Sequence, residues 1–162
     1  DDFENYTNQL LGKSYGFVKT NTSLELVAAF TVSNSMLPVS SLPKNIRNKI
    51  NRPIPNVKRN SQYPAVLVGQ LAVFDSFAGK HIGDEILSFI KGWFIDPLNK
   101  TGCRYIIVDA ANNEKVIDFY QRNGFKFIFE NITEEIEYMK LDLEPEYKRT
   151  RLMYFDLIIL KS

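Results

Sequence analysis

Residues 71–87 read LAVFDSFAGKHIGDEIL and join two kinds of pattern in one stretch. Its start continues an apolar run over 65–74 that predicts a buried strand, and from Ile82 onward apolar side chains recur at helical spacing. A short turn containing Gly79 lies between the two patterns. A turn of this kind directs free backbone N–H groups and a helix N-terminus at one point, where a phosphate can bind. The stretch therefore predicts a strand, a turn and a helix around an anion site.

A second informative stretch, residues 113–125, reads NEKVIDFYQRNGF. It follows an apolar run over 104–109 that predicts another strand. Asn112 or Asn113 can cap the helix that comes next, and Gly124 is well placed as its left-handed last residue. The stretch therefore predicts a capped helix that follows directly on a strand.

The rest of the chain predicts short elements separated by turns. They are a helix over 2–12, strands over 15–19 and 24–33, a short helix over 44–50, and strands over 125–130, 136–143 and 152–160. No repeat or linker divides the sequence, so we expect a single domain over 1–162. The order of elements predicts an α/β fold with a central mixed, mostly antiparallel β-sheet flanked by helices.

The composition limits the classes of protein that fit. The chain has 162 residues, of which 44% are hydrophobic and 24% charged, as is typical of one globular domain. No apolar run is long enough to cross a bilayer, and no signal peptide is visible. Because the chain starts at Asp1 without a methionine, a fragment that lacks its native N-terminal strand is left open.

The chain contains one cysteine, Cys103, and one histidine, His81. A single cysteine excludes an intramolecular disulfide and suits the reducing cytoplasm, which is the expected location. One histidine and one cysteine cannot build a zinc site of the usual kind, so we expect no metal. Cys103 is expected to pack at the start of a strand, since nothing near it in the sequence favours a nucleophile.

The segment from Pro38 to Pro64 carries basic residues with no acidic residue among them. These are Lys44, Arg47, Lys49, Arg52, Lys58 and Arg59. The simplest interpretation is a solvated surface loop. The alternative is a docking patch for an acidic or nucleic-acid acceptor, although the net charge of the whole chain is only +1.

The two stretches together resemble the Gcn5-related N-acetyltransferases (GNAT). In that family a strand leads into the motif Gln/Arg-x-x-Gly-x-Gly/Ala, whose positions are taken here by residues 78–83, AGKHIG. A later helix of the family typically reads Asn-x-x-Ala-x-x-Phe-Tyr-x-x-x-Gly-Phe, and residues 113–125 match it almost throughout. The resemblance covers residues from about 24 to 130. It departs from the family at Ala78, where Gln or Arg is usual, and at His81, where glycine is usual.

The resemblance implies an enzyme that transfers an acetyl group from acetyl-coenzyme A to a primary amine. Backbone N–H groups at the start of the first helix would hold the pyrophosphate, helped by Lys80, and a strand edge would pair with the pantetheine amides. The residues expected to bind the cofactor are Leu71, Ala72, Val73, Ala78, Gly79, Lys80, His81, Ile82, Gly83, Asp84 and Asn113. Simpler roles are open for some of them: an exposed loop residue for His81, a solvent-facing acid for Asp84 and a helix cap for Asn113.

Tyr120 occupies the family's position for the general acid that protonates the departing thiolate. A phenol with a pKa near ~10 is fully protonated at neutral pH and can serve in this way. A backbone N–H near Val73 would stabilise the oxyanion that forms on the carbonyl. No carboxylate or histidine is distinguished as a general base.

The acceptor and the partners are left open by the sequence. Asp2-Phe3, the proline-rich basic segment and residues 69–73, GQLAV, resemble a GNAT subgroup of toxins that acetylate aminoacyl-tRNA. The acceptor alternatives are therefore a charged tRNA and a small amine, and a homodimer or an antitoxin partner is open. Ala78 and His81 favour a different class of function, a non-catalytic domain that binds acyl-coenzyme A or another protein.

Overall fold

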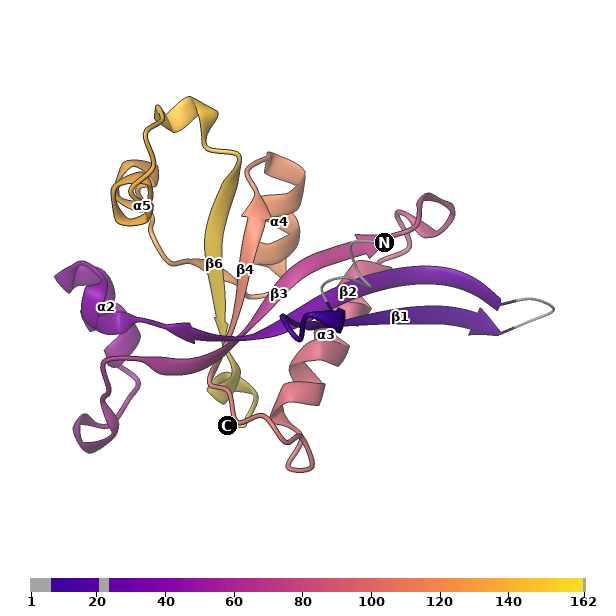
Figure 1. Cartoon of the computed structure of the whole chain (residues 1–162), viewed down its shortest axis with the longest axis horizontal. Helices are drawn as coiled ribbons and strands as arrows, with labels where there is room; N and C mark the ends of the chain where they lie inside the picture. Colours follow the sequence, from indigo (N-terminus) through magenta and orange to yellow (C-terminus); the bar gives the residue numbers. More distant parts are fainter. Residues whose placement is uncertain (1–6, 21–23, 162) are drawn as a thin grey trace.

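The computed structural model describes residues 7–20 and 24–161 (Figure 1). The strands are β1 (Lys13–Thr20), β2 (Leu24–Leu37), β3 (Tyr63–Val73), β4 (Tyr105–Ala111), β5 (Lys126–Phe127) and β6 (Thr150–Asp156). The helices are α2 (Lys44–Asn51), α3 (Ile82–Ile95), α4 (Glu114–Arg122) and α5 (Ile132–Met139). The strands form one sheet in the order β1-β2-β3-β4-β6-β5. β3 and β4 are parallel and the other neighbours pair antiparallel, so the predicted mixed, mostly antiparallel sheet is confirmed.

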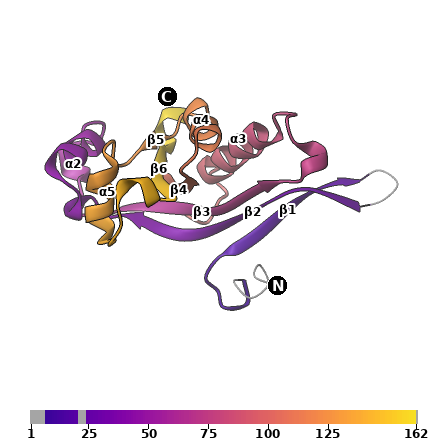
Figure 2. The same cartoon turned by 90° about the horizontal axis from the view of Figure 1, so that it is seen from above.

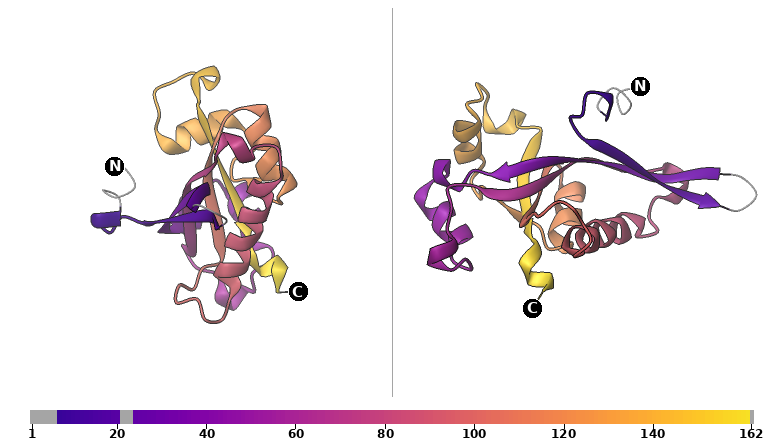
Figure 3. Two further views of the ribbon diagram at one scale, coloured as in Figure 1. Left: turned by 90° about the vertical axis from the view of Figure 1, so that its right-hand side faces the viewer. Right: turned by 60° about the horizontal axis from the view of Figure 1, so that its bottom comes forward.

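Two hydrophobic clusters lie on opposite faces of the sheet. Successive residues of β4 alternate between them: Ile106 and Val108 belong to one cluster, Tyr105 and Ile107 to the other. The first cluster is closed by α3 and α4, which lie along the same side of β3 (Figure 2). The second is covered by α2, and α5 lies across β6 from α3 and α4 (left view of Figure 3).

β3 changes its pairing halfway along its length. Thr31 of β2 is opposite Gln70 but Val32 is opposite Val68, so Gly69 is an extra residue on β3. The parallel pairing of β3 with β4 also ends at Val68. Beyond this bulge, residues 71–73 pair with β2 alone and leave the second edge of β3 free.

The helix predicted from residues 113–125 is confirmed in detail. The Asn113 side chain accepts a hydrogen bond from the Val116 N–H at 3.0 Å, and Gly124 ends the helix at φ +82°. The predicted strands over 15–19, 24–33, 65–74 and 104–109 and the helices over 44–50 and 82–94 are also present, with ends shifted by a few residues. Of the helix expected over 2–12, residues 2–6 lie outside the described residues; Thr7 and Asn8 are helical, and Leu10 at φ +57° follows them.

The strand predicted over 136–143 is wrong, because residues 136–139 belong to α5 and residues 140–143 form no strand. Asn131 caps that helix by accepting from the Thr133 N–H, Glu134 and Glu135 favour its N-terminal dipole, and Lys140 ends it in a left-handed conformation. The strand expected over 125–130 has only two residues, and β6 ends at Asp156, whose side chain caps a 3-10 turn over Leu157–Leu160.

Candidate active site

The loop before α3 has the open backbone donors that an anion needs. Gly79 (φ +76°) and His81 (φ +57°) turn the chain, and the N–H groups of Asp84 and Glu85 both donate to the His81 carbonyl. Within the described residues, the N–H groups of Gly79, Lys80, His81, Ile82 and Gly83 have no hydrogen-bond partner. The prediction that the donors extend to Asp84 is wrong, because the tight first turn uses its N–H. The Ala78 N–H is likewise bonded to the Asp75 carbonyl.

His81 adopts the backbone conformation that a glycine would adopt at its position. At φ +57° it lies in the left-handed region, which histidine enters more readily than most residues. Its Nδ1 is 3.2 Å from Asp84 Oδ2, and its side chain is otherwise exposed. At the position where the family pattern has glycine, His81 therefore adopts a left-handed backbone conformation and adds an exposed side chain.

Gly83 is where the two helices and the free edge of β3 meet. A Cβ atom added to it would lie 3.0 Å from Cε2 of Phe119 on α4 and 4.0 Å from Cγ2 of Val73 on β3. A contact of 3.0 Å is tighter than most carbon contacts, so a side chain at residue 83 would require the Phe119 ring to shift by a few tenths of an ångström. The structure thus brings together the residues predicted at 71–73, at 79–83 and on α4.

The Asp84 carboxylate joins α3 to α4. Its Oδ1 and Oδ2 accept from Nε and Nη2 of Arg122, each at 3.0 Å, and Oδ1 accepts from Asn123 Nδ2 at 2.6 Å. These hydrogen bonds, chiefly those of Arg122, hold the pKa of Asp84 well below its usual range. The simpler reading of Asp84 as a solvent-facing acid is therefore wrong: its charge is matched by α4.

Lys91 extends the same contact two turns along α3. Its Nζ donates to the Asn123 carbonyl at 2.6 Å and lies 4.2 Å from the centroid of the Phe155 ring. Burial is the main cause that lowers the pKa of this lysine. Lys91 thus caps the C-terminal end of α4, because its ammonium group pairs with the Asn123 carbonyl, which has no partner within the helix.

The free edge of β3 presents alternate residues. The Phe74 N–H donates to the Val27 carbonyl and the Gln70 N–H to the Thr31 hydroxyl, so these two residues direct their backbone donors at β2. Because backbone groups alternate along a strand, Ala72 also faces β2, whereas Leu71 and Val73 face the open side. Of the predicted residues 71–73, therefore, Leu71 and Val73 offer main-chain bonds to a ligand, and Ala72 is already engaged.

Tyr120 is buried on α4, between Phe119 and Phe125, with ring centroids 5.0 Å and 5.3 Å away. Burial raises the pKa of Tyr120 to about 12. Within the described residues its hydroxyl has no hydrogen-bond partner, so it is available to a ligand. Asn113, at the other end of α4, uses its side-chain oxygen as the helix cap, as the simpler reading expected.

The basic segment lies far from this site. α2 is at one end of the long axis of the molecule, and the loop before α3 is at the other (Figure 1). Lys49 is paired with Glu130 at 2.6 Å, and Arg59 donates to the Ile54 carbonyl. Among the described residues, no ion-pair partner exists for Lys44, Arg47, Arg52, Lys58 or Arg59, since a neutral carbonyl does not cancel the charge of Arg59. Five cations of the predicted patch therefore keep uncompensated charge.

The sequence missed several residues that shape the site. Gly69 produces the bulge, and a glycine inside a strand pattern is a signal that could have found it. Arg122, Asn123 and Lys91 gave no such signal, because their partners on the other helix are more than 30 residues away in the chain.

Other candidate centres carry little chemistry. Burial raises the pKa of the Cys103 thiol to about 11, which disfavours a nucleophilic thiolate. No group of three His, Cys, Asp or Glu side chains among residues 7–20 and 24–161 is placed to hold a metal ion.

A cavity of about 580 Å³ lies between the start of β1 and the end of α3, and none of the predicted site residues lines it. None of the helices in the described part is both long and apolar enough to cross a membrane.

No protein-family model matches the chain. Solved structures do resemble it. A Tyr-to-Phe mutant of KacT has a TM-score of 0.65 at 21% identity, covering 99% of this chain and 80% of KacT. AtaT complexed with acetyl-methionyl-tRNAfMet has a TM-score of 0.67 at 17% identity, covering 98% and 79%. AtaTR bound with AcCoA has a TM-score of 0.58 at 16% identity, with the same coverage. These likenesses confirm the fold that the GNAT resemblance predicts.

Proposed function

We propose that the chain is an N-acetyltransferase that moves an acetyl group from acetyl-coenzyme A to a primary amine. One observation carries the proposal: the open donors before α3, the free edge of β3 and the Tyr120 helix converge around Gly83. A long ligand with phosphates at one end and amides along its arm needs such a combination. The similar AtaTR structure, which contains AcCoA, supports this ligand.

Binding is assigned to the backbone. The N–H groups of residues 79–83 would donate to the pyrophosphate, with the positive end of the α3 dipole behind them. The open main-chain groups of Leu71 and Val73 would pair with the pantetheine amides, as an added strand would. Gly83 fits this arrangement because its missing side chain lets the start of α3 lie close to Phe119 of α4 and Val73 of β3.

The chemistry assigned to the chain is to stabilise charge and to supply a proton. Acetyl-coenzyme A, when bound, supplies the thioester whose C–S bond breaks as the new C–N bond forms. The Val73 N–H donates to the carbonyl oxygen as it gains negative charge. Tyr120, which with a pKa of about 12 is protonated throughout the physiological range, gives its phenolic proton to the sulfur; the proton that the amine nitrogen loses as the amide forms passes through solvent and restores the phenol.

The acceptor we propose is the amino group of a charged tRNA. A structure of AtaT, which is similar in fold, shows it complexed with acetyl-methionyl-tRNAfMet. The unpaired cations Lys44, Arg52 and Lys58 are exposed at the end of the molecule opposite the α3 loop, where a large polyanion has room to lie. AtaT also binds the antitoxin AtaR, so we propose a protein antitoxin as partner and the cytoplasm as location.

The substitution Tyr120→Phe tests the catalytic assignment. Removing the phenolic proton should lower kcat by about 10²–10⁴-fold, while the Kd for acetyl-coenzyme A, measured by calorimetry, stays unchanged. Phe mutants of a tyrosine in KacT and AtaT have been crystallised, which is consistent with such a role. The matched control is Tyr147→Phe, since Tyr147 is 66% exposed. Cofactor binding without turnover of any amine by the unmodified chain would instead favour the non-catalytic binding domain.

Salt dependence tests the acceptor. If tRNA is the substrate, Arg52→Gln and Lys58→Gln should each weaken kcat/KM for aminoacyl-tRNA and reduce the slope of log K against log salt by about 1. Lys49→Gln is the control, because its charge is already paired with Glu130. Turnover of a small amine that is insensitive to both salt and these substitutions would count against tRNA.

A further inference from the structure

The structure provides a cation at the start of α3 that the sequence pattern lacks. At position 78, where the resemblance expects Gln or Arg, the chain has Ala78. Lys80 Nζ donates to the Ser76 carbonyl at 3.4 Å and lies over the Phe77 ring, so in this structure it makes no hydrogen bond at the first turn of α3. The guanidinium that lies at the first turn of α3 is that of Arg122, which comes from α4.

Arg122 belongs to the same surface as the open backbone donors. Its Cζ lies 5.2 Å from the centroid of the Phe119 ring, and the edge of that ring is the group closest to Gly83. Its two bonds to Asp84 place it beside the carboxylate that His81 also contacts. The guanidinium of Arg122 therefore lies next to the loop of free N–H groups. It contacts Phe119, which packs against Gly83, and it is hydrogen-bonded to Asp84 in the first turn of α3.

The guanidinium has donors to spare. Nε and Nη2 each bond Asp84, and the remaining N–H groups have no partner among the described residues. The Arg122 side chain is 53% exposed, whereas that of Asp84 is 26% exposed. Asp84 also accepts from Asn123, so it can share Arg122 with a second anion and stay hydrogen-bonded. A planar guanidinium with a free edge matches the oxygen pair of a phosphate.

We propose that Arg122 binds the pyrophosphate of coenzyme A at the N-terminus of α3, in place of the side chain that Ala78 lacks. The inference rests on the proposed function, since it names a residue for the same ligand.

A double-mutant cycle tests the proposal by calorimetric titration with coenzyme A. The proteins are the unmodified chain, Arg122→Gln, Asp84→Asn and the double variant. If Arg122 contacts the phosphate, Arg122→Gln should raise the Kd for coenzyme A by about tenfold. The Kd of the double variant should exceed that of Asp84→Asn by the same factor. Arg122→Lys, which keeps the charge but not the planar fork, should give a smaller increase.

The cycle also shows when the proposal is wrong. If Arg122 only neutralises Asp84, the loss of affinity disappears in the Asp84→Asn background, and the proposal is overturned. Dephospho-coenzyme A locates the contact: an equal loss for both ligands supports the pyrophosphate, and a loss confined to coenzyme A overturns it in favour of the 3′-phosphate.

Folding and the proposed function are checked separately. Thermal unfolding without ligand compares the four proteins, and the double variant leaves no carboxylate without its cation, so it guards against loss of the fold. Unchanged affinity in Arg122→Gln overturns this inference alone. Failure of the unmodified chain to bind coenzyme A overturns the proposed function as well.

Discussion

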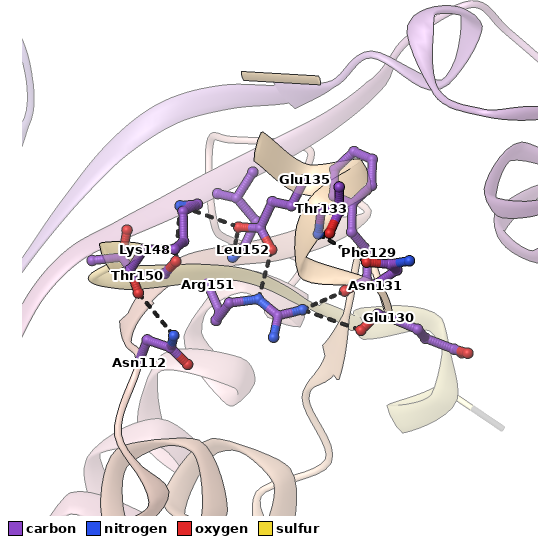
Figure 4. Close-up of polar contacts among 10 residues, drawn as sticks. All are labelled: Asn112, Phe129, Glu130, Asn131, Thr133, Glu135, Lys148, Thr150, Arg151 and Leu152. Carbon is purple, nitrogen blue, oxygen red and sulfur yellow. Dashed lines mark hydrogen bonds and ion pairs between the residues drawn. The ribbon is translucent and has the colours of Figure 1, made fainter. Parts of the chain in front are cut away.

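Two carboxylates, those of Glu135 and Asp84, each attach a helix to a neighbouring element. Glu135 is buried, whereas Asp84 is partly exposed to solvent. Glu135 of α5 is fully buried; it accepts from Arg151 Nε at 2.7 Å and from the Leu152 N–H at 2.8 Å, with Lys148 Nζ at 3.5 Å (Figure 4). Asp84 of α3 is held by Arg122 and Asn123 at similar distances but remains partly exposed. The geometry of the two contacts is alike, and the surroundings differ.

The partners of the two carboxylates show what the difference means. Arg151 also donates to the Phe129 carbonyl at 2.7 Å, and Lys148 donates to the Thr150 carbonyl, so the donors around Glu135 are directed at the protein itself (Figure 4). This network holds α5 on the edge of β6 where β5 has ended. Arg122 keeps free donors at the surface. The network around Glu135, whose donors are all used within the protein, stabilises the fold. The contact between Arg122 and Asp84 leaves donors that can also bind a ligand.

The largest effect is expected from breaking the closed network with Glu135→Gln. The change leaves Arg151 and Lys148 buried with no anion between them, and it should lower the free energy of unfolding by about 3–5 kcal/mol. Urea denaturation followed by circular dichroism measures it. The proposed acyl-coenzyme A site is at the other helices, so protein that stays folded should bind the cofactor normally.

Glu130→Gln is the matched control, because it is chemically the same change at a position five residues before Glu135. Glu130 pairs with Lys49 at the surface with its side chain 80% exposed, so its removal should cost less than about 1 kcal/mol. Equal losses in the two variants would contradict the distinction between a sealed and an open carboxylate.

A smaller effect is expected from Asp84→Asn, and it should depend on pH. Because Arg122 lowers the pKa of Asp84 in the folded state, the stabilising contribution is present above the unfolded pKa and is lost as the pH falls below it. At neutral pH the variant should lose less than about 1 kcal/mol, since Arg122 is half exposed. Unfolding in urea at neutral pH and near pH ~3 measures the change.

The control for this variant is Glu85→Gln, at the next position of α3. Glu85 is exposed and has no side-chain partner among the described residues, so at neutral pH the variant should match the unmodified chain. A difference between the Asp84→Asn variant and the unmodified chain that grows on acidification would contradict the assigned sign.

The predictions that succeeded rest on local patterns. α4 begins after Asn113 and ends before Gly124, as expected. A helix cap and a left-handed last residue depend on hydrogen bonds within a few residues, so the sequence predicts them well. α5 was mistaken for a strand for the opposite reason. Its segment alternates well enough to fit a strand, and the Asn131 cap, with Glu135 reaching β6, decides for the helix.

The candidate site was predicted in part. The loop at 79–83, the strand at 71–73 and the helix that carries Tyr120 were identified from the sequence, and in the structure Gly83 lies beside Val73 of the strand and Phe119 of the helix. The sequence did not show that Ala72 faces β2, that the Asp84 N–H is used or that Asp84 binds α4. Each of these depends on a strand or helix that is distant in the chain.

The sequence by itself determined the turn before α3, the limits of α4 and the placement of Tyr120 on it, since these follow from backbone preferences and spacing over a few residues. Only the tertiary structure decided that β3 leaves β4 after Gly69 and that Arg122 meets Asp84, 38 residues away. The physical reason is that a free strand edge and an ion pair between helices depend on how distant elements pack, and no local preference encodes that distance.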